Sequence, residues 1–464
     1  MPKPVVGLLP LYVELYDASL PEMRLRIERH LAEASAALEG IGLTVLAAPV
    51  CRLAVEFERA VTGFEEGGAD AIVTLHLAYS PSLESEAALV RTKLPLIVLD
   101  TTPNERFDEG TDPAEMMFNH GIHGVQDMCN RLLRQGKPFE IHAGHLRSSD
   151  VLERLRRSVW AAMLVSRLRH SRVGLVGEPF TGMGDFLVGF DELQRDLGPT
   201  VVRGDASLRP ATTVPAAAVA AELEADAVRF EQTDGLVPDS HEASTRAGLV
   251  LREWADREGL TALTVNFMAA SSSNPALPVM PFLECSKAME RGLGYAGEGD
   301  VLTAAWVGAL LQCFPETTFT EMFCPDWRSG AVFLSHMGEF NYRIADGRPR
   351  LTTLPFPYTD AGDPAVAYSS LRAGPAILAN LSPFGQGRYR LTISPGHVRR
   401  ATRDNRLSAL VNGWFVPDSG LIPFLEEYSR RGATHHSALV YTEHESLAVL
   451  ISAGRFLELD VAVV

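Results

Sequence analysis

The chain has 464 residues, of which 46% are hydrophobic and 22% charged, and its 58 acidic and 42 basic residues give a net charge of −16. This length exceeds one ordinary core, so we expect about two or three globular domains. The acidic balance disfavours nucleic acid as a partner, and the absence of any run of about 18 apolar residues disfavours a membrane span. Five cysteines without a CxxC pair, and an N-terminus typical of a strand rather than a signal peptide, predict a cytoplasmic protein without disulfides.

The first part of the chain, residues 1–145, alternates short apolar runs with helical patterns. The clearest helix follows the capping residue Ser19 and stops at Gly40, with apolar side chains on one face. Apolar runs separated by helices predict a parallel sheet covered on both faces, which is an α/β domain.

The same order of elements repeats from about residue 140, beginning with FEIHAG and a helix over 151–170, and continues through RVGLVGE, TVVRGD and LTALTVNF. We interpret residues 146–325 as a second α/β domain. Short strands bounded by Gly and Pro then follow, namely AVFLSHM, RLTTLPF, PAILANLS and GRYRLTISPG, with helices near 420–430 and 443–453. The predicted fold is therefore two doubly wound, Rossmann-like α/β domains followed by an antiparallel, β-barrel-like domain over 326–464.

The stretch GYAGEGD, residues 294–300, has three glycines around a single acid, Glu298. Its G-x-x-G-x-G spacing, its place after a helical segment and the acid inside it argue against a nucleotide-phosphate loop. The next residues look like a helix capped by Asp300, so Glu298 lies near a helix N-terminus that favours a carboxylate. The alternative from the turn alone is a solvent-exposed Glu298.

Further ionisable side chains lie in the C-terminal part of the chain. Glu321 lies in a β-prone stretch, His336 ends an apolar strand, and His435 and His436 precede another. Because neighbouring strand residues point to opposite faces, we expect at most one of the paired histidines to face any given site. Two carboxylates and two imidazoles would together suit Mn²⁺, Co²⁺, Fe²⁺ or Zn²⁺. The spacing alone does not show that they meet, and an edge carboxylate or core histidines are the alternatives.

Two more histidines, His120 and His123, follow the first-domain strand PLIVLDT, on the side where open α/β sheets bind ligands. The alternative is a pair of surface histidines in a loop that enters a helix.

These segments, in this order, resemble the L-arabinose isomerase family. GLGYAGEGDVLTAA is similar to the family's GYGFAGEGD segment, and TTFTEMF, LSHMGE and GATHHS resemble its SFMED, GSHMLE and GAHHT segments. NHGIHG resembles NQxxHG, AGHLRSSDV resembles the GHW segment, and PLY resembles HLY. The matched blocks extend from near residue 7 to near residue 440.

The resemblance implies a divalent metal, usually Mn²⁺, bound by Glu298, Glu321, His336 and His436. It also implies a sugar held near Tyr12 and His123, with an active site completed by a neighbouring subunit of a trimer-based hexamer. The sequence departs from the family where His120 replaces the Gln of NQxxHG, Leu146 replaces the Trp of GHW, and an apolar residue replaces a Gln before Tyr12.

The function implied is a metal-dependent aldose–ketose isomerase that acts through a cis-enediol, with Glu298 and Glu321 moving protons as base and acid. Its partner would be a small sugar, a pentose, a hexose or a related molecule, in a homo-oligomer, a trimer or a hexamer. The alternatives are other carbohydrate chemistry, such as epimerisation of a modified sugar, and a sugar-binding protein without catalysis.

Overall fold

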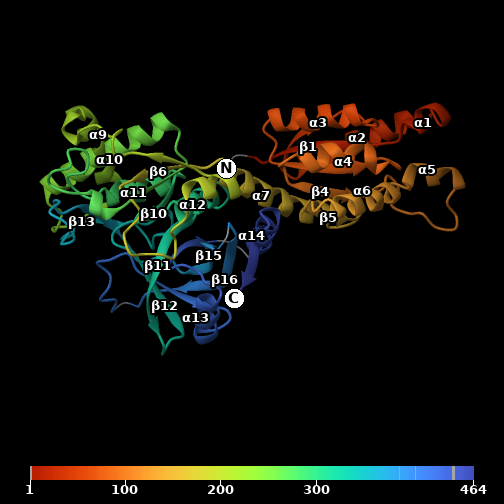
Figure 1. The fold of residues 1–464 in the computed structure, drawn as a ribbon. Coiled ribbons are helices and arrows are strands. Elements are labelled where there is room, and N and C mark those ends of the chain that lie inside the picture. The colour runs from red at the N-terminus through yellow and green to blue at the C-terminus, as the bar shows by residue number, and fades with distance from the viewer. Residues whose placement is uncertain (1–2, 386, 403, 442–444) are drawn as a thin grey trace. The chain divides into compact units, whose positions relative to one another are not determined.

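The computed structural model describes residues 3–385, 387–402, 404–441 and 445–464. The chain divides into two compact units (Figure 1). Unit 1 contains residues 1–166 and 448–458, and unit 2 contains residues 167–447 and 459–464. No helix among the described residues is long and apolar enough to cross a membrane.

Unit 1 is built on a five-stranded, fully parallel sheet with the strand order β2-β1-β3-β4-β5. Its strands are β1 (Val5–Leu11), β2 (Thr44–Ala47), β3 (Ala71–His76), β4 (Leu96–Asp100) and β5 (Phe139–Ala143). The central strands β1, β3 and β4 are buried almost throughout, because helices connect successive strands and cover the sheet. The predicted first α/β sheet is confirmed.

The helix predicted to follow a Ser19 cap stops at Gly40 as expected, but it begins at Met23, because Ser19 ends the preceding helix and its hydroxyl donates to the Leu15 carbonyl. The helices of unit 1 are α1 (Glu14–Ser19), α2 (Met23–Gly40), α3 (Ala54–Glu66), α4 (Ser82–Arg91), η1 (Pro113–Glu115), α5 (Met116–Asn119) and α6 (Ile122–Arg134). Helix α7 (Val151–Arg169) runs across the division between the units. Helix α14 (Glu445–Phe456) starts just after residues 442–444, so the beginning of its predicted range lies outside the described residues.

The segment FEIHAG differs from its expected place in the chain. The sequence predicts that it opens the second repeat of elements, but β5 pairs in parallel with β4 and completes the first sheet. An apolar run predicts that a strand forms. The sheet that this strand joins depends on pairing with a segment far away in the sequence, which the run does not encode.

Unit 2 begins with a four-stranded parallel sheet in the order β10-β9-β6-β7. Its strands are β6 (Arg172–Val176), β7 (Thr200–Arg203), β9 (Ala262–Val265) and β10 (Gly294–Gly297). Its helices are α8 (Phe190–Asp196), η2 (Ala211–Thr213), α9 (Ala216–Arg229), α10 (Pro238–Glu258), η3 (Phe267–Ala269), α11 (Phe282–Glu290) and α12 (Val301–Cys313). This sheet confirms the predicted second α/β layer.

Six antiparallel strands of unit 2 close into a barrel, in the order β15-β18-β11-β12-β17-β16 with β16 pairing back to β15. They are β11 (Thr317–Asp326), β12 (Ala331–Ser335), β15 (Gly374–Pro383), β16 (Tyr389–Arg399), β17 (Gly413–Pro417) and β18 (His436–Tyr441). The last strand, β19 (Asp460–Val463), pairs in parallel with β16, and α13 (Leu421–Arg430) lies between β17 and β18 in the chain. The predicted barrel is confirmed.

Two details of the β-rich region differ from the sequence analysis. Strand β11 starts at Thr317, so the barrel begins before the predicted boundary at residue 325. RLTTLPF does not enter the barrel, because β13 (Arg350–Thr353) forms a separate three-stranded sheet with β14 (Ala365–Tyr368) and β8 (Glu231–Gln232). The short helix η4 (Tyr342–Ile344) precedes β13.

Helix α12 joins the parallel sheet to the barrel within unit 2. It contacts β9 and β10 on the sheet side and β11, β15 and β18 on the barrel side. Nearly all of its side chains are buried, and the indole N–H of Trp306 donates a hydrogen bond to the Ala379 carbonyl of β15. The turn at the N-terminus of α12 is therefore held next to the barrel strands.

Candidate metal centre

The glycine-rich turn between β10 and α12 places Glu298 in the interior. Glu298 is 8% exposed and adopts a left-handed backbone conformation with φ of 62°, so the solvent-exposed alternative is wrong. Two hydrogen bonds fix the turn: the Phe180 N–H donates to the Glu298 carbonyl, and the Gly299 N–H donates to Thr264 Oγ1. A Cβ at Gly299 would lie 2.6 Å from the Pro179 Cα, so only glycine permits this close approach.

Barrel register brings the second carboxylate to the same place. Glu321 on β11 is paired with His436 at the start of β18 and with Ser335 at the end of β12, next to His336. The Oε1 atom of Glu321 lies 3.0 Å from His436 Nε2 and 3.3 Å from His336 Nε2. Glu298 Oε2 lies 3.4 Å from His436 Nε2, so both carboxylates meet this imidazole.

Four side chains, Glu298, Glu321, His435 and His436, offer ligand atoms that all lie within 4.8 Å of one another. The expectation that only one of the paired histidines faces the site is wrong. Strand β18 begins at His436, so His435 lies before the regular alternation and its ring centroid lies 4.2 Å from that of His436. His336 lies beside this group of four, because its Nε2 atom is 3.3 Å from Glu321 Oε1.

Each histidine of this region has a second carboxylate partner on its Nδ1 side. His436 Nδ1 hydrogen bonds to Asp300 Oδ2 at 2.9 Å, and Asp300 is fully buried. His435 Nδ1 pairs with Asp185 at 2.6 Å. His336 Nδ1 lies 2.9 Å from the buried Glu339, in an ion pair without hydrogen-bond geometry. These partners orient the rings so that each Nε2 atom faces Glu298 or Glu321.

Sequence reasoning did not assign these carboxylate partners to the site. The sequence predicts Asp300 as a helix cap, and this is confirmed, because its Oδ1 accepts the Thr303 N–H at 2.8 Å. Glu339 lies three residues after His336, so proximity in the sequence was a usable signal. Asp185 is distant in the sequence from His435, and no local pattern marks it.

The charges of the cluster reinforce one another. Burial raises the pKa of Glu298, but the neighbouring imidazoles of His435 and His436 outweigh it and lower that pKa to about 2. The pKa of Glu321 is likewise lowered, because His336 and His436 outweigh its burial. Burial lowers the pKa of His336, but Glu339 and Glu321 outweigh it and raise that pKa to about 10, and the pKa of His436 is raised in the same way. The carboxylates are therefore ionised, with positive charge held between them.

Two atoms at the centre of the cluster support a cation there. Glu298 Oε2 and His436 Nε2 are buried and lack a hydrogen-bond partner. Buried polar atoms without partners are costly, and a cation between carboxylate oxygens and imidazole nitrogens would satisfy both. This mixed oxygen and nitrogen donor set fits a divalent transition metal. Metal binding would replace the protons on the histidines.

The three first-domain residues, Tyr12, His120 and His123, lie in unit 1. Tyr16 OH is 3.0 Å from His120 Nε2, and the ring centroids of His120 and His123 are 5.5 Å apart. The Tyr12 ring contacts the Tyr16 ring, and burial raises the pKa of Tyr12 to about 12. The structure thus gathers side chains from the segment after β1 and from the N-terminal end of α6, and adds Tyr16, which the sequence does not single out.

The fold and the cluster define a multidomain α/β protein with a β-barrel and a candidate divalent-metal centre. A sequence model described as the L-arabinose isomerase C-terminal domain matches residues 316–452. An L-arabinose isomerase of Bacillus licheniformis is 26% identical over 415 residues, which cover 84% of this chain and 82% of the relative. One from Nocardioides is 24% identical over 90% of this chain and 86% of the relative, and one from Bacillus subtilis is 23% identical over 80% and 76%.

The chain is therefore similar to L-arabinose isomerases over most of its length, and its residues 316–452 match the C-terminal domain of that family. Among solved structures, a periplasmic solute binding protein from Actinobacillus succinogenes with bound D-allose is 11% identical and covers 67% of this chain and 92% of its own. Its TM-score of 0.18 is too low to support an argument about fold or ligand.

Proposed function

We propose that this protein is a metal-dependent aldose–ketose isomerase acting on a pentose, a hexose or a related sugar. The observation that carries the proposal is the pair of buried carboxylates, Glu298 and Glu321, that meet at His436 with unsatisfied ligand atoms between them. The similarity to L-arabinose isomerases supports the same reaction class.

Glu298, Glu321 and His436 form the core of the proposed ligand set, with Mn²⁺ as the proposed metal. His336 is the fourth ligand in this proposal, because its Nε2 faces Glu321 and Glu339 backs its other nitrogen. His435 is less suited, since its side chain is 37% exposed and its Nε2 atom lies 3.8 Å from Glu298 Oε2.

Aldose–ketose isomerisation moves one proton between adjacent carbons and another between their oxygens, through a cis-enediol. A bound divalent cation withdraws charge from the substrate oxygens and so acidifies the neighbouring C–H group. The ionised Glu298 and Glu321 would take and return the protons as base and acid. Tyr12, His120 and His123 are proposed to hold the sugar, in an active site shared between subunits of a homo-oligomeric trimer or hexamer, as the resemblance implies.

The decisive experiment is a sugar panel assayed with Mn²⁺, with Co²⁺, Fe²⁺ or Zn²⁺, and with EDTA. We expect ketose formation that requires metal and is lost in Glu298→Gln and Glu321→Gln, while both variants unfold like the wild type. Glu105→Gln, an exposed glutamate outside the cluster, is the matched control. Wild-type rates in both cluster variants would refute the assignment.

The ligand set has its own test. His336→Gln should weaken Mn²⁺ binding more than His435→Gln does, measured by calorimetry on the metal-free protein. If His435→Gln instead weakens Mn²⁺ binding more than His336→Gln does, His435 rather than His336 is the fourth metal ligand.

A second candidate, chemistry on a modified sugar, is favoured by the altered sugar-side residues His120 and Leu146. NMR of products formed in D₂O identifies the carbon that exchanges its proton, and exchange away from the carbonyl pair would favour this candidate. Thermal stabilisation by sugar without any product would instead indicate a binding protein.

A further inference from the structure

Asn380, on β15, is a fully buried polar side chain next to the candidate metal centre. It follows Ala379, which is the last residue of β15 that pairs with β18, opposite Ala438. Beyond this pair β18 still contains Ser437 and His436, whose other edge pairs with β11. The backbone of these two residues thus leaves the regular pairing with β15 where the site begins.

The Asn380 side chain replaces this strand pairing. Its Nδ2 atom donates to the His436 carbonyl at 2.5 Å and to Thr434 Oγ1 at 2.8 Å. Its Oδ1 atom accepts the Thr434 N–H at 3.2 Å, and Thr434 Oγ1 donates to the His436 carbonyl at 2.9 Å. One amide group therefore holds the backbone on both sides of His435.

These hydrogen bonds account for two neighbouring histidines that face one site. In a regular strand, successive side chains point to opposite faces, which would separate His435 from His436. Because Asn380 holds Thr434 and His436, residue 435 stays outside the strand, which begins at His436. The His435 N–H donates to Asp185 at 3.0 Å instead of to a neighbouring strand. The two imidazole centroids then lie 4.2 Å apart.

The residue before Asn380 connects the same strand to the other half of the site. The Ala379 carbonyl accepts the indole N–H of Trp306 on α12, and the turn that precedes α12 carries Glu298. Two consecutive residues of β15 thus hold both α12 and the segment of His436. The 3.4 Å separation of Glu298 Oε2 and His436 Nε2 is maintained through these two connections.

The residue type at position 380 indicates hydrogen bonding rather than packing. Leu378, two residues earlier and on the same face of β15, is also fully buried, so an aliphatic side chain of similar volume fits this face. A buried asparagine is costly unless its donors and its acceptor are used. Aspartate, which has the same shape, offers acceptors alone.

We propose that Asn380 is a positioning residue of the metal centre, which fixes the backbone of residues 434–436 so that His435 and His436 both face Glu298. Asn380 touches neither metal nor substrate in this role and acts through the two histidines. The role rests on the proposed function for its purpose, whereas the geometry that Asn380 maintains is tested without metal.

The first variant is Asn380→Asp, which keeps the size of the side chain and an acceptor for the Thr434 N–H. It loses the N–H group that donates to the His436 carbonyl and places an oxygen there instead. We expect the affinity for Mn²⁺, measured by calorimetry on the full chain, to fall at least about tenfold, as for other residues that orient metal ligands. Asn380→Leu, which removes every hydrogen bond of the side chain and adds no charge, should have the same effect, and it replaces the first variant if that one does not fold.

Asn412 provides the matched control. It is also a fully buried asparagine of unit 2, and its Nδ2 atom donates to the Leu407 and Leu410 carbonyls, outside the cluster. Asn412→Asp and Asn412→Leu should lose stability in thermal unfolding much as the Asn380 variants do, with unchanged affinity for Mn²⁺. An equal fall of Mn²⁺ affinity in both pairs of variants would reflect a general loss of barrel stability and would overturn the positioning role.

A second measurement needs no metal. In EDTA, diethyl pyrocarbonate modifies accessible histidine nitrogens, and mass spectrometry gives the rate at each residue, with the exposed His397 as the internal reference. Once Asn380 no longer holds the segment, His435 separates from its carboxylate partners, so we expect it to react severalfold faster in both Asn380 variants than in the wild type. In the Asn412 variants, His435 should react as it does in the wild type.

The two measurements distinguish the possible failures. Wild-type Mn²⁺ affinity, or wild-type reactivity of His435, in the folded Asn380 variants would overturn the positioning role. If the wild type itself binds no Mn²⁺, the proposed metal centre is wrong, and the reactivity of His435 alone decides whether Asn380 holds the segment. Ketose formation by the wild type is measured separately, so a failure of the isomerase assignment changes neither result.

Discussion

Glu298 combines a strained backbone with a buried charge. Its φ of 62° is uncommon for a residue with a Cβ, and glycine would adopt it without cost. A chain that keeps glutamate at this position gains something that glycine cannot supply, which is the carboxylate facing His436. The strain is thus an independent sign that the side chain, rather than the turn, is needed.

This strain predicts an unusual order of stability. Glu298→Gly and Glu298→Ala both remove the carboxylate, so they differ mainly in the cost of the left-handed conformation. We expect the glycine variant to be more stable by about 1 kcal/mol, although glycine normally destabilises a chain relative to alanine. Urea unfolding of the two variants in EDTA measures the difference. Equal stability of the two variants would mean that residue 298 leaves the left-handed conformation once the carboxylate is removed.

Asp300 serves two roles with its two carboxylate oxygens, one on His436 and one on the first turn of α12. Asp300→Asn keeps a capping oxygen but loses the charge that orients His436. We expect Mn²⁺ affinity to fall by about 10–100-fold with little change in stability. Asp300→Ala should show the same metal defect plus about 1 kcal/mol of destabilisation from the lost cap. Equilibrium dialysis and thermal unfolding separate the two effects, and unchanged affinity in Asp300→Asn would contradict the orienting role.

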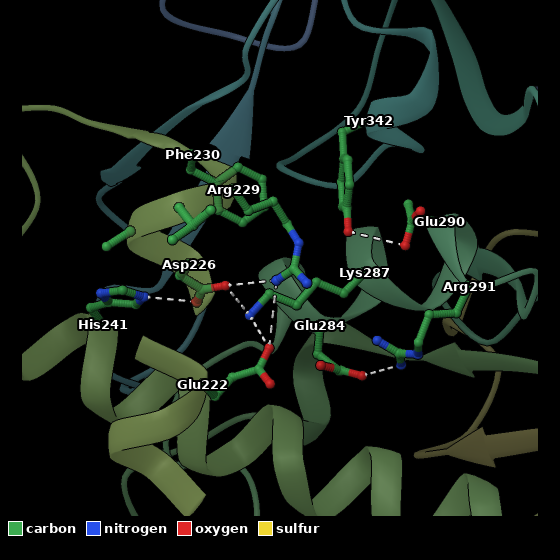
Figure 2. Close-up of polar contacts among 12 residues, drawn as sticks. Glu222, Asp226, Arg229, Phe230, His241, Glu284, Lys287, Glu290, Arg291 and Tyr342 are labelled. Carbon is green, nitrogen blue, oxygen red and sulfur yellow. Dashed lines mark hydrogen bonds and ion pairs between the residues drawn. The ribbon is translucent and has the colours of Figure 1, made fainter. Parts of the chain in front are cut away.

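At the scale of elements, a buried ionic network ties together three helices of unit 2. Figure 2 shows Lys287 of α11 directed at Glu222 and Asp226 of α9, with Nζ–O distances of 2.7 and 2.6 Å. Lys287 is 3% exposed, and Asp226 is fully buried and also contacts His241 of α10. Arg252 of α10 joins Glu222 to Glu284 of α11. The network fixes α11, which leads into β10 and the Glu298 turn.

Breaking this network should be expensive. Lys287→Met leaves Glu222 and Asp226 without their shared cation, so we expect a loss of about 3–5 kcal/mol in the free energy of unfolding. Lys3→Met, at an exposed lysine, is the control and should change stability by less than about 0.5 kcal/mol. Chemical denaturation measures both. If Lys287→Met loses as little stability as the control, Arg229 and His241 alone are enough to stabilise the buried Asp226 carboxylate.

At the scale of the whole molecule, two buried histidines make unit 1 sensitive to acid. Burial lowers the pKa of His30 to about 4 and that of His76 to about 3. His76 has no hydrogen-bond partner on either nitrogen, and a Cβ at Gly124 would lie 2.4 Å from its ring, so the ring has little room to move. Both rings stay neutral in the folded state at pH values where an unfolded histidine becomes charged.

The unfolded chain therefore takes up these protons first, and stability falls as the pH drops below about 6.5. At pH 5 each histidine should cost up to about 2 kcal/mol, before carboxylate protonation contributes. Urea unfolding at pH 7 and pH 5, in EDTA and without sugar, tests this. His76→Leu should reduce the pH dependence, whereas His397→Leu, at an exposed histidine, should not. Equal pH dependence in the wild type and in His76→Leu would contradict the assignment.

The layers of this protein and the chemical groups of its candidate site can be predicted from the amino-acid sequence. Apolar runs and capping signals predict both α/β sheets and the barrel, because the periodicity of buried side chains reflects local geometry. The residue types of Glu298, Glu321, His336 and His436 indicate a divalent-metal centre in the same way, since donor chemistry is a property of single side chains.

Which of these groups meet depends on contacts between distant segments of the chain. Strand register places Glu321 beside His436, and the start of β18 lets His435 join a group from which alternation would exclude it. The same holds for β5 in the first sheet, for β13 outside the barrel, and for Asp185 behind His435. Each of these depends on pairing between segments far apart in the chain, and local periodicity carries no information about the partner that a strand edge or a side chain will find.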